Sequence, residues 1–284
     1  MKSTYWCCVV TRDGESTVGA TLDSIFNQSL PPSFVVVVDD GSTDGTPALL
    51  ERESARHPGL RTIHTSSRTR DIRRVPALLN LGLGLARSIQ EASGPEYMMV
   101  SGDDNWLPPN YASAVVDRMD KDQRVAVASG SPTGSPLGSD WLPHGGGRFV
   151  RSAFMEGLGG KYPVAYGWET WLIYKAMEEG LLVKNYGDLR YRHLRPYNVK
   201  NLMGWGRGMY SLGFPSYFVF LRCALNLVWA QRGTQSRTGS MAMAAGYVSA
   251  KLSPGLLRPM LIDDDHLKAF VRRFCAERLM KLKW

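Results

Sequence analysis

Paired carboxylates follow two apolar segments of this chain. Asp39 and Asp40 end the valine run of FVVVVDDGSTDGT, and Asp103 and Asp104 follow the apolar part of YMMVSGDDNWL. Two acidic pairs in one place would repel each other unless a cation or a bound donor group compensates them. Carboxylate oxygens suit Mg²⁺ or Mn²⁺, which complete their coordination shell with water and substrate phosphates. The four aspartates therefore predict a site for a divalent cation and a phosphorylated ligand.

Each acidic segment also has a simpler interpretation. An Asp-Gly pair after a strand often forms only a turn, and Asp-Asp-Asn before Pro108 and Pro109 can be a helix-capping turn. Both segments occur in an order and at a spacing that suit two strands of one nucleotide-binding sheet. The occurrence of both acidic segments in one chain therefore favours the site for a cation and a phosphorylated ligand over two unrelated turns.

The valine run predicts the element that positions the first acidic pair. Four consecutive β-branched residues without polar alternation are typical of a central strand of a parallel sheet, buried on both faces. In such sheets, ligands bind at the carboxyl ends of the strands. Gly41 allows a tight turn there, and Ser42 or Asp44 can cap the helix that begins near Thr46.

Strands and helices alternate along the first half of the chain. Apolar spacing predicts strands at 6–10, 60–64 and from residue 97, and helices at 17–27, 46–56 and 74–91. Further strands are expected at 125–129, 182–185 and 189–192, with a long Gly-, Ser- and Pro-rich loop over 130–147. The pattern predicts an α/β fold with a doubly wound, mostly parallel sheet.

Two groups of side chains beside these elements allow two interpretations each. The arginines before the helix at 74 either meet phosphates or form a solvated face; they are Arg68, Arg70, Arg73 and Arg74. His144 in the long loop either contacts an acceptor or is an ordinary loop histidine.

Composition bounds the class of protein. The chain has 284 residues, 44% of them hydrophobic, which suffices for one large α/β domain with an appendage or for two smaller domains. Its 4 cysteines have neither CxxC spacing nor the density of a disulfide scaffold, which indicates core thiols in a reducing compartment. No basic region followed by an apolar stretch precedes the first strand, so we expect a cytoplasmic location.

Charge is divided unevenly along the chain. Residues 1–180 carry 17 Lys and Arg against 21 Asp and Glu, whereas residues 181–284 carry 17 against 5. The basic C-terminal third predicts an anionic partner such as a membrane surface or a phosphorylated lipid. Nucleic acid is disfavoured because the tail has no interleaved aromatic platforms and no recognisable binding motif.

Two segments carry a family resemblance. They are TLDSIFNQSLPPSFVVVVDDGSTDGT and SGDDNWLPP, and with them the sequence resembles the family 2 glycosyltransferases of the GT-A fold, the second segment corresponding to the family's DxD region. The resemblance implies a UDP-, GDP- or dTDP-linked sugar donor held across the sheet edge. It places Asp40 near the base with Asp39 supporting it, Asp103 toward the sugar and ribose, and Asp104 on a Mn²⁺ or Mg²⁺ ion.

A third segment, GWETWLIYKAMEEG, resembles the family's helix that opens with an acidic pair, whose second acid is the base of an inverting transfer. Glu169 takes the second position, and Trp168 stands where the first acid usually is. General-base catalysis needs only one carboxylate within hydrogen-bond reach of the acceptor hydroxyl. The missing first acid keeps an alternative open: a catalytically silent GT-A module that serves as a membrane-associated binding or scaffolding subunit.

The resemblance extends to RHLRPYNVKNLMGWGRGMYSLG, where the family often has a histidine followed by a helix that closes over the donor diphosphate. It implies His193 as a metal or phosphate contact and Arg207 as a phosphate clamp. We therefore expect a GT-A domain over 1–195 and a helical region over 196–284.

The helical region carries the second functional signal. The segment 217–230 is too short and too polar to span a bilayer of about 30 Å. The segment 265–284 is amphipathic; its apolar side is Leu267, Phe270, Val271 and Phe274, and its basic residues are Lys268, Arg272, Arg273, Lys281 and Lys283. Either these helices lie in the plane of a membrane, or they form a helical subdomain and homo-oligomer interface. The first interpretation predicts contact with the cytoplasmic face of a membrane and a glycan or lipid-linked acceptor.

Overall fold

The computed structural model describes residues 3–66, 73–89, 94–134, 140–195, 202–228 and 236–280. Their contacts divide the chain into two compact units, each of which is described by itself. The first unit comprises Met1–Arg70, Ala77–Tyr162 and Glu179–Pro196, and the second comprises Asp71–Pro76, Pro163–Glu178 and Tyr197–Trp284.

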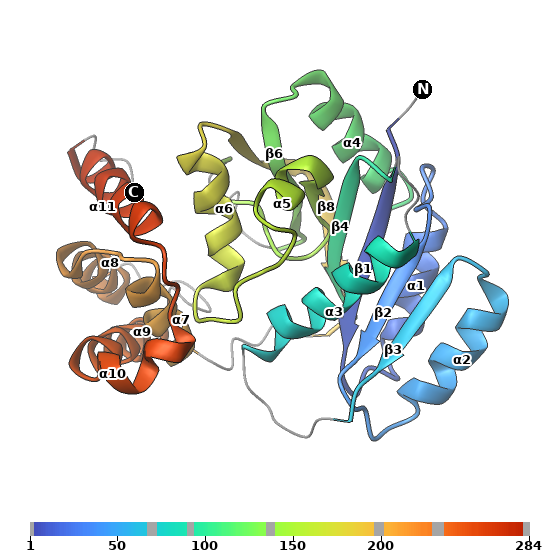
Figure 1. Cartoon of the computed structure of the whole chain (residues 1–284), viewed down its shortest axis with the longest axis horizontal. Coiled ribbons are helices and arrows are strands. Elements are labelled where there is room, and N and C mark those ends of the chain that lie inside the picture. The colour runs from blue at the N-terminus through green and yellow to red at the C-terminus, as the bar shows by residue number, and fades with distance from the viewer. Residues whose placement is uncertain are drawn as a thin grey trace. The chain divides into compact units, whose positions relative to one another are not determined.

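A mixed, mostly parallel sheet forms the centre of the first unit (Figure 1). Its strands are β1 (Tyr5–Thr11), β2 (Val35–Asp39), β3 (Leu60–His64), β4 (Tyr97–Gly102), β5 (Asn105–Trp106), β6 (Val125–Pro132), β7 (Arg148–Arg151) and β8 (Leu182–His193), in the spatial order β3-β2-β1-β4-β7-β6-β8-β5. The first four strands are parallel to one another, as are β6 and β8. Strand β7 runs antiparallel to β4 and β6, and β5 antiparallel to β8. The predicted α/β fold with a mostly parallel sheet is confirmed.

Helices pack on both faces of this sheet. They are α1 (Val18–Phe26), α2 (Thr46–Arg56), α3 (Arg74–Ile89), α4 (Tyr111–Lys121) and α5 (Ser152–Gly157). All four valines of β2 are fully buried. Val35 and Val37 share a core with Leu22 of α1. On the opposite face, α3 approaches so closely that a Cβ on Gly82 would lie 2.6 Å from Sγ of Cys8. The valine run is thus a central strand buried on both faces, as predicted.

One prediction about the later strands is wrong, and one strand was not predicted. The two short strands expected at 182–185 and 189–192 are one strand, β8, whose pairing with β6 shifts register between Ser129 and Ser131. The irregularity occurs where β6 pairs first with Asn185 and then with Arg190, which absorbs the residues that interrupt the apolar pattern. The short strand β5 was not expected, because two residues carry no periodic signal.

The second unit is helical. It contains α6 (Trp168–Glu178), α7 (Leu202–Ser211), α8 (Ser216–Val228), α9 (Arg237–Leu252), α10 (Pro254–Leu257), the 3₁₀ helix η2 (Arg258–Met260) and α11 (Asp265–Met280). The expected helical C-terminal region is therefore present. Within the described ranges, no helix combines the length and the apolar character that crossing a membrane requires. All four cysteines are buried and free, which agrees with the predicted core thiols.

Helix α11 buries its apolar side inside this unit. Leu267, Val271 and Cys275 are fully buried. The ring centroids of Phe274 and Tyr174 of α6 lie 5.6 Å apart. The apolar face that the sequence offered to a membrane is covered by protein in this helix, which agrees with the helical-subdomain interpretation. Lys281 and Lys283 lie outside the described residues.

Candidate active site

Parallel pairing brings the two acidic segments to one edge of the sheet. Thr11 at the end of β1 pairs with Asp39 at the end of β2, and Val10 pairs with Gly102 at the end of β4. The hydroxyl of Thr11 donates a hydrogen bond to Oδ2 of Asp103 over 2.7 Å. The predicted edge of the sheet thus gathers Asp39, Asp40, Asp103 and Asp104.

Asp39 organises the turn after β2. Its Oδ1 accepts hydrogen bonds from the amide of Ser42 at 3.1 Å and from the Ser42 hydroxyl at 2.5 Å. Its Oδ2 lies 3.1 Å from Nδ1 of His64. Gly41 between them has φ of 66°, a conformation that favours glycine. These bonds fit the supporting role that the resemblance implies for Asp39.

Asp40 is also buried, with 6% of its surface exposed. Nη1 of Arg12 is 3.4 Å from its Oδ2, and the hydroxyl of Thr65 is 3.4 Å from its Oδ1. Its backbone amide donates to the carbonyl of Thr11. The carboxylate is therefore held in place by neighbours just after β1 and just after β3.

The loop after β1, TRDGES, was not singled out in the sequence. Oδ1 of Asp13 accepts a hydrogen bond from the amide of Thr43 at 2.9 Å, which joins this loop to the turn after β2. A Cβ on Gly14 would lie 2.4 Å from Oγ1 of Thr11 and 2.5 Å from Oδ2 of Asp103, so only glycine fits. A glycine next to an acid directly after a buried strand is the signal that could have identified this loop.

The N-cap residue of helix α2 is Gly45, so neither Ser42 nor Asp44 takes the N-cap position. Asp44, one residue earlier, still supports the start of the helix, because its Oδ1 accepts hydrogen bonds from the amide of Thr46 at 3.1 Å and from its hydroxyl at 2.6 Å. Ser42 instead bonds Asp39.

Arg195 supplies the positive charge that two neighbouring acids require. Its guanidinium hydrogen-bonds Oδ1 of Asp103, and its Nε lies 3.7 Å from Oδ2 of Asp104. Burial raises the pKa of Asp103, although the bonds from Thr11 and Arg195 act in the opposite direction. Arg195 was not predicted; it stands two residues after His193, just beyond the end of β8.

Asp104 and His193 fit a divalent cation. Strand β5 pairs Asn105 with His193, and the amide of Leu194 donates to the carbonyl of Asp104 at 2.7 Å. Nδ1 of His193 and Oδ1 of Asp104 are 4.0 Å apart. Two ligands of one ion lie within about 4.4 Å of each other when each bond is about 2.0–2.2 Å long. Burial lowers the pKa of His193 against the opposing effect of Asp104, which favours the neutral, metal-binding imidazole. A cation at this position would either share the carboxylate of Asp104 with Arg195 or displace the Arg195 guanidinium from it.

A second group of possible metal ligands joins α1 to the end of α2. Ligand atoms of Asp23, Glu53 and His57 all lie within 4.8 Å of one another. Arg56 already pairs with Glu53 at 2.9 Å and lies 3.9 Å from Asp23. None of the residues predicted to bind metal belongs to this group.

The predicted base belongs to the second unit. Gly167, with φ of 86°, precedes α6, and its carbonyl accepts hydrogen bonds from the amides of Thr170 and Trp171. Glu169 lies in the first helical turn and is partly buried. A carboxylate in this position is stabilised by the partial positive charge of the helix N-terminus. The site residues of the first unit are Asp39, Asp40, Asp103, Asp104 and His193, whereas Glu169 and Arg207 belong to the second.

Two guanidinium groups of the second unit flank Tyr166. Nη1 of Arg207 donates to the Tyr166 hydroxyl at 3.1 Å, and its Cζ lies 5.6 Å from the ring centroid. Cζ of Arg73 lies 5.9 Å from the same centroid. Tyr166 was not predicted, and of the arginine cluster before α3, Arg68 and Arg70 lie outside the described residues. The arrangement is a compact cationic group that suits phosphate.

His144 is anchored through its backbone. Its amide donates to the hydroxyl of Ser129 at 2.7 Å, and its carbonyl accepts from Nε of Arg148 at 2.9 Å. Burial, with the nearby charge of Arg148, lowers the pKa of His144 to about 4. These contacts agree with the interpretation of His144 as a loop histidine.

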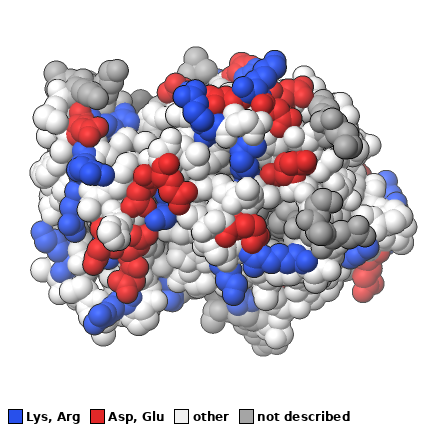
Figure 2. All heavy atoms as spheres, turned by 45° about the horizontal axis from the view of Figure 1, so that its top comes forward, with Lys and Arg blue, Asp and Glu red and all other residues white. Residues whose placement is uncertain are grey.

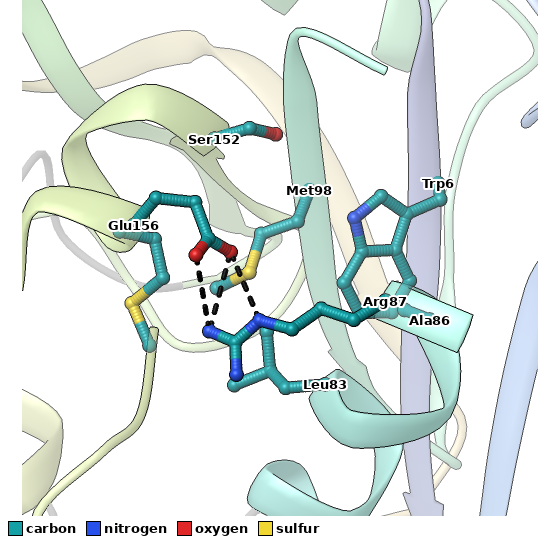
Figure 3. A pocket seen from close by; sticks show the side chains of 8 residues that line it. Trp6, Leu83, Ala86, Arg87, Met98, Ser152 and Glu156 are labelled. Atoms are coloured by element: carbon teal, nitrogen blue, oxygen red, sulfur yellow. Dashed lines mark hydrogen bonds and ion pairs between the residues drawn. The ribbon is translucent and has the colours of Figure 1, made fainter. Parts of the chain in front are cut away.

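A separate hollow of about 250 Å³ lies against the sheet face that α3 covers. Figure 3 shows Arg87 of α3 reaching across it to the carboxylate of Glu156 on α5. Nη2 of Arg87 is 3.2 Å from Oε2 of Glu156 and also donates to the carbonyl of Gly160 at 2.7 Å. Trp6 and Met98, which line the hollow, stand near the starts of β1 and β4. The hollow is therefore away from the acidic edge, and an ion pair spans it.

Comparisons with known proteins agree with the family resemblance. Residues 6–181 match the family model described as Glycosyl transferase family 2. A Bacillus subtilis (strain 168) protein named as a glycosyltransferase, EpsH, is 24% identical over 138 residues, which is 46% of this chain and 36% of EpsH. The chain thus matches about a third of the length of that relative.

Solved structures share the fold at low sequence identity. The mannosyltransferase PcManGT from Pyrobaculum calidifontis, in complex with GDP-Man and Mn²⁺, aligns over 100% of this chain and 89% of its own with a TM-score of 0.58 and 17% identity. TarS 1-349 of S. aureus, in complex with UDP-GlcNAc, aligns over 88% of this chain and 73% of its own with a TM-score of 0.56 and 14% identity. GalNAc-T7 with UDP, GalNAc and Mn²⁺ aligns over 91% and 58% with a TM-score of 0.58 and 13% identity.

Proposed function

We propose, from the premise that this chain belongs to glycosyl transferase family 2, that it transfers a sugar from a nucleoside diphosphate to an acceptor hydroxyl with inversion at the anomeric carbon. The observation that carries the proposal is the acidic edge of the first unit, where Thr11, Arg12 and Arg195 contact the carboxylates of Asp40, Asp103 and Asp104. An edge of this kind suits a ligand with a sugar, a ribose and phosphates.

The donor is a UDP-, GDP- or dTDP-linked sugar. Asp40 receives the base, Asp39 keeps the turn beneath it in shape, and Asp103 accepts hydroxyl groups of the sugar and ribose. The partial burial of this edge strengthens hydrogen bonds to the charged carboxylates. GDP-Man and UDP-GlcNAc in the complexes of similar fold support this donor class.

Asp104 and His193 hold a Mn²⁺ or Mg²⁺ ion, which when bound stabilises the negative charge of the departing diphosphate. Their 4.0 Å separation supports this assignment. Arg207 adds a second positive charge, and Arg73, whose guanidinium lies over the same Tyr166 ring, adds a further one. Guanidinium groups hold phosphate oxygens through paired hydrogen bonds.

Glu169 is the general base. The acceptor oxygen attacks the anomeric carbon, its proton passes to the Glu169 carboxylate, and the bond from the anomeric carbon to the diphosphate oxygen breaks with both electrons on that oxygen. Its place in the first turn of α6 supports the assignment, because the partial positive charge of a helix N-terminus interacts favourably with a carboxylate there.

The acceptor is a glycan or lipid-linked precursor at the cytoplasmic face of a membrane. The uneven charge supports this part of the proposal, because residues 181–284 carry 17 basic against 5 acidic residues. In this scheme residues 1–195 form the catalytic domain and residues 196–284 contact the membrane or a second copy of the chain.

Trp168 favours one alternative function. It replaces the first acid of the family's pair, so a catalytically silent module that binds nucleotide sugar as a membrane-associated scaffold is the second candidate. Such a module would bind the donor without turning it over.

A thermal-shift panel of UDP-, GDP- and dTDP-sugars, with and without Mn²⁺, tests the donor assignment. We expect one nucleotide class to raise the melting temperature, and to do so more strongly with the metal. If no nucleotide changes the melting temperature under either condition, the proposed function is wrong. Release of nucleoside diphosphate in the presence of acceptor then separates the enzyme from the silent module.

A further inference from the structure

Helix α9 has a buried face lined by glycine and an exposed face that carries large apolar side chains. One face packs on α7 through glycines: a Cβ on Gly246 would lie 2.0 Å from the carbonyl oxygen of Met203, so the backbones touch. The opposite face carries Met241, Val248 and Leu252, which are 64%, 37% and 78% exposed. These residues recur at helical spacing. The solvent-facing side of a helix normally carries polar residues. This face of α9 carries large apolar side chains instead.

Helix α8 repeats the pattern beside it. Its buried side contains Val219 and Cys223. Its outer side exposes Tyr217 by 49%, Phe220 by 45% and Val228 by 68%. Figure 1 shows α8 and α9 next to each other with α10 at the end of α9, and the contacts between these helices agree. Three successive helices of the second unit thus leave apolar side chains outside.

The turn from α9 to α10 is the most exposed part of this surface. Every residue from 251 to 256 is exposed. Leu256 is 80% exposed, as open as Leu252 across the turn. Lys251 and Arg258 are exposed on either side of the two leucines. Exposed leucines flanked by cations are typical of segments that enter the boundary between lipid headgroups and acyl chains.

Charge decides which apolar partner this surface suits. From Leu189 to Ile262 the sequence contains 10 Lys and Arg and no Asp or Glu. Figure 2 shows one face of the molecule, on which basic and acidic side chains are intermixed. Among the described side chains of that face, charge alone does not identify a docking surface. On α8 to α10, positive charge without any acid coincides with exposed apolar side chains. That combination is complementary to an anionic bilayer.

We propose that the outer faces of α8, α9 and α10 bind the surface of an anionic lipid bilayer, with Leu252 and Leu256 inserted below the headgroups and Lys251 and Arg258 on the lipid phosphates. The proposal rests on the membrane location of the acceptor in the proposed function, and it does not depend on sugar transfer. It also assigns the contact to α8–α10 and not to α11, whose apolar side is buried.

Flotation of the full chain with vesicles tests this surface. Vesicles of phosphatidylcholine with phosphatidylglycerol are compared with vesicles of phosphatidylcholine alone, for the wild type, for L252E/L256E and for Leu81→Glu. Leu81 is an exposed leucine of α3 in the first unit, 47% exposed, and serves as the matched control. We expect the wild type and the control to float with anionic vesicles, and binding of the double variant to fall about tenfold or more.

The outcomes separate the two proposals. Wild-type binding by the double variant would overturn this surface. Failure of the wild type to float with any vesicle would overturn both this surface and the membrane location of the acceptor. A change from oligomer to monomer in the double variant, without any vesicle binding by the wild type, would assign the surface to a second copy of the chain and overturn the lipid assignment. If a soluble acceptor and the donor panel give no transfer while vesicle binding behaves as expected, the proposed function fails and this surface stands.

Discussion

The two units of the chain expose different kinds of surface. Among the described residues, 15 large apolar side chains are exposed, and only Leu81 and Leu142 of them belong to the first unit. In the first unit, the exposed chemistry lies instead at the sheet edge, where carboxylates are held by hydrogen bonds and ion pairs. The acidic edge is the basis of the donor proposal for the first unit, and the exposed apolar side chains are the basis of the lipid-surface proposal for the second.

The largest expected effect concerns the proton transfer assigned to the second unit. Glu169→Gln keeps the size of the side chain and removes its basicity, so we expect the transfer rate to fall by about 10²–10⁴-fold. Nucleotide binding should be unchanged, because the carboxylate of Glu169 is assigned to the acceptor hydroxyl and not to the donor. Transfer kinetics and a nucleotide-induced thermal shift measure the two separately. Full transfer by the variant would show that Glu169 is not the base.

A stability comparison within α11 tests whether its apolar side is structural. Leu267 is fully buried, whereas Met280 of the same helix is 77% exposed. We expect Leu267→Ala to lower the free energy of unfolding by about 3 kcal/mol and Met280→Ala to change it by less than about 0.5 kcal/mol. Denaturant unfolding followed by circular dichroism measures both. Equal effects would mean that α11 is not packed as described, and its membrane interpretation would return.

The metal site of the first unit gives an intermediate effect. With nucleotide and Mn²⁺ at about a hundred times their dissociation constants, ligand binding should stabilise the fold by about 2.7 kcal/mol. We expect Asp104→Asn to remove the part of this stabilisation that depends on Mn²⁺, as EDTA does for the wild type. Asp122→Asn, at a partly exposed acid of the same unit, is the control. A Mn²⁺-dependent shift that survives in Asp104→Asn would place the ion elsewhere, and the group of Asp23, Glu53 and His57 would be the next to test.

Replacement of Arg195 has the smallest expected effect, and it tests whether this arginine competes with the metal at the acidic edge. Its side chain is 39% exposed, so its ion pairs with Asp103 and Asp104 contribute at most about 1 kcal/mol. If Arg195 competes with the metal for Asp104, Arg195→Ala should tighten Mn²⁺ binding up to about fivefold without nucleotide. Calorimetric titration of Mn²⁺ measures this. Weaker Mn²⁺ binding in the variant would mean that Arg195 supports the metal site.

The elements of the first unit could be predicted from local sequence because their signals are local. The valine run gives β2, and apolar spacing gives α2 and β3 with the observed bounds. Contacts between distant segments could not be predicted. Arg195 and Thr11 each meet Asp103 across 92 residues, and nothing in the sequence near any of the three indicates the pairing.

The amphipathic helices show a second limit of sequence reasoning. Periodicity identifies an apolar face, but it cannot tell what covers that face. In α11 the predicted apolar residues Leu267 and Val271 are buried by protein, whereas α9 exposes Met241 and Leu252. Glycines let α7 and α9 touch through their backbones, and Met241 and Leu252 lie outside that contact.

Hydrogen–deuterium exchange of the full chain tests most directly whether the sheet edge binds the donor and α8 to α10 bind lipid. One sample contains a nucleotide sugar with Mn²⁺, and the other contains anionic vesicles. We predict that the nucleotide protects the segments after β1, β2 and β4, around Thr11–Asp13, Asp39–Thr43 and Asp103–Asn105, and that vesicles protect α8 to α10. Protection of α8 to α10 by the nucleotide alone, or protection of the sheet edge by vesicles, would contradict the assignment of two partners to two units.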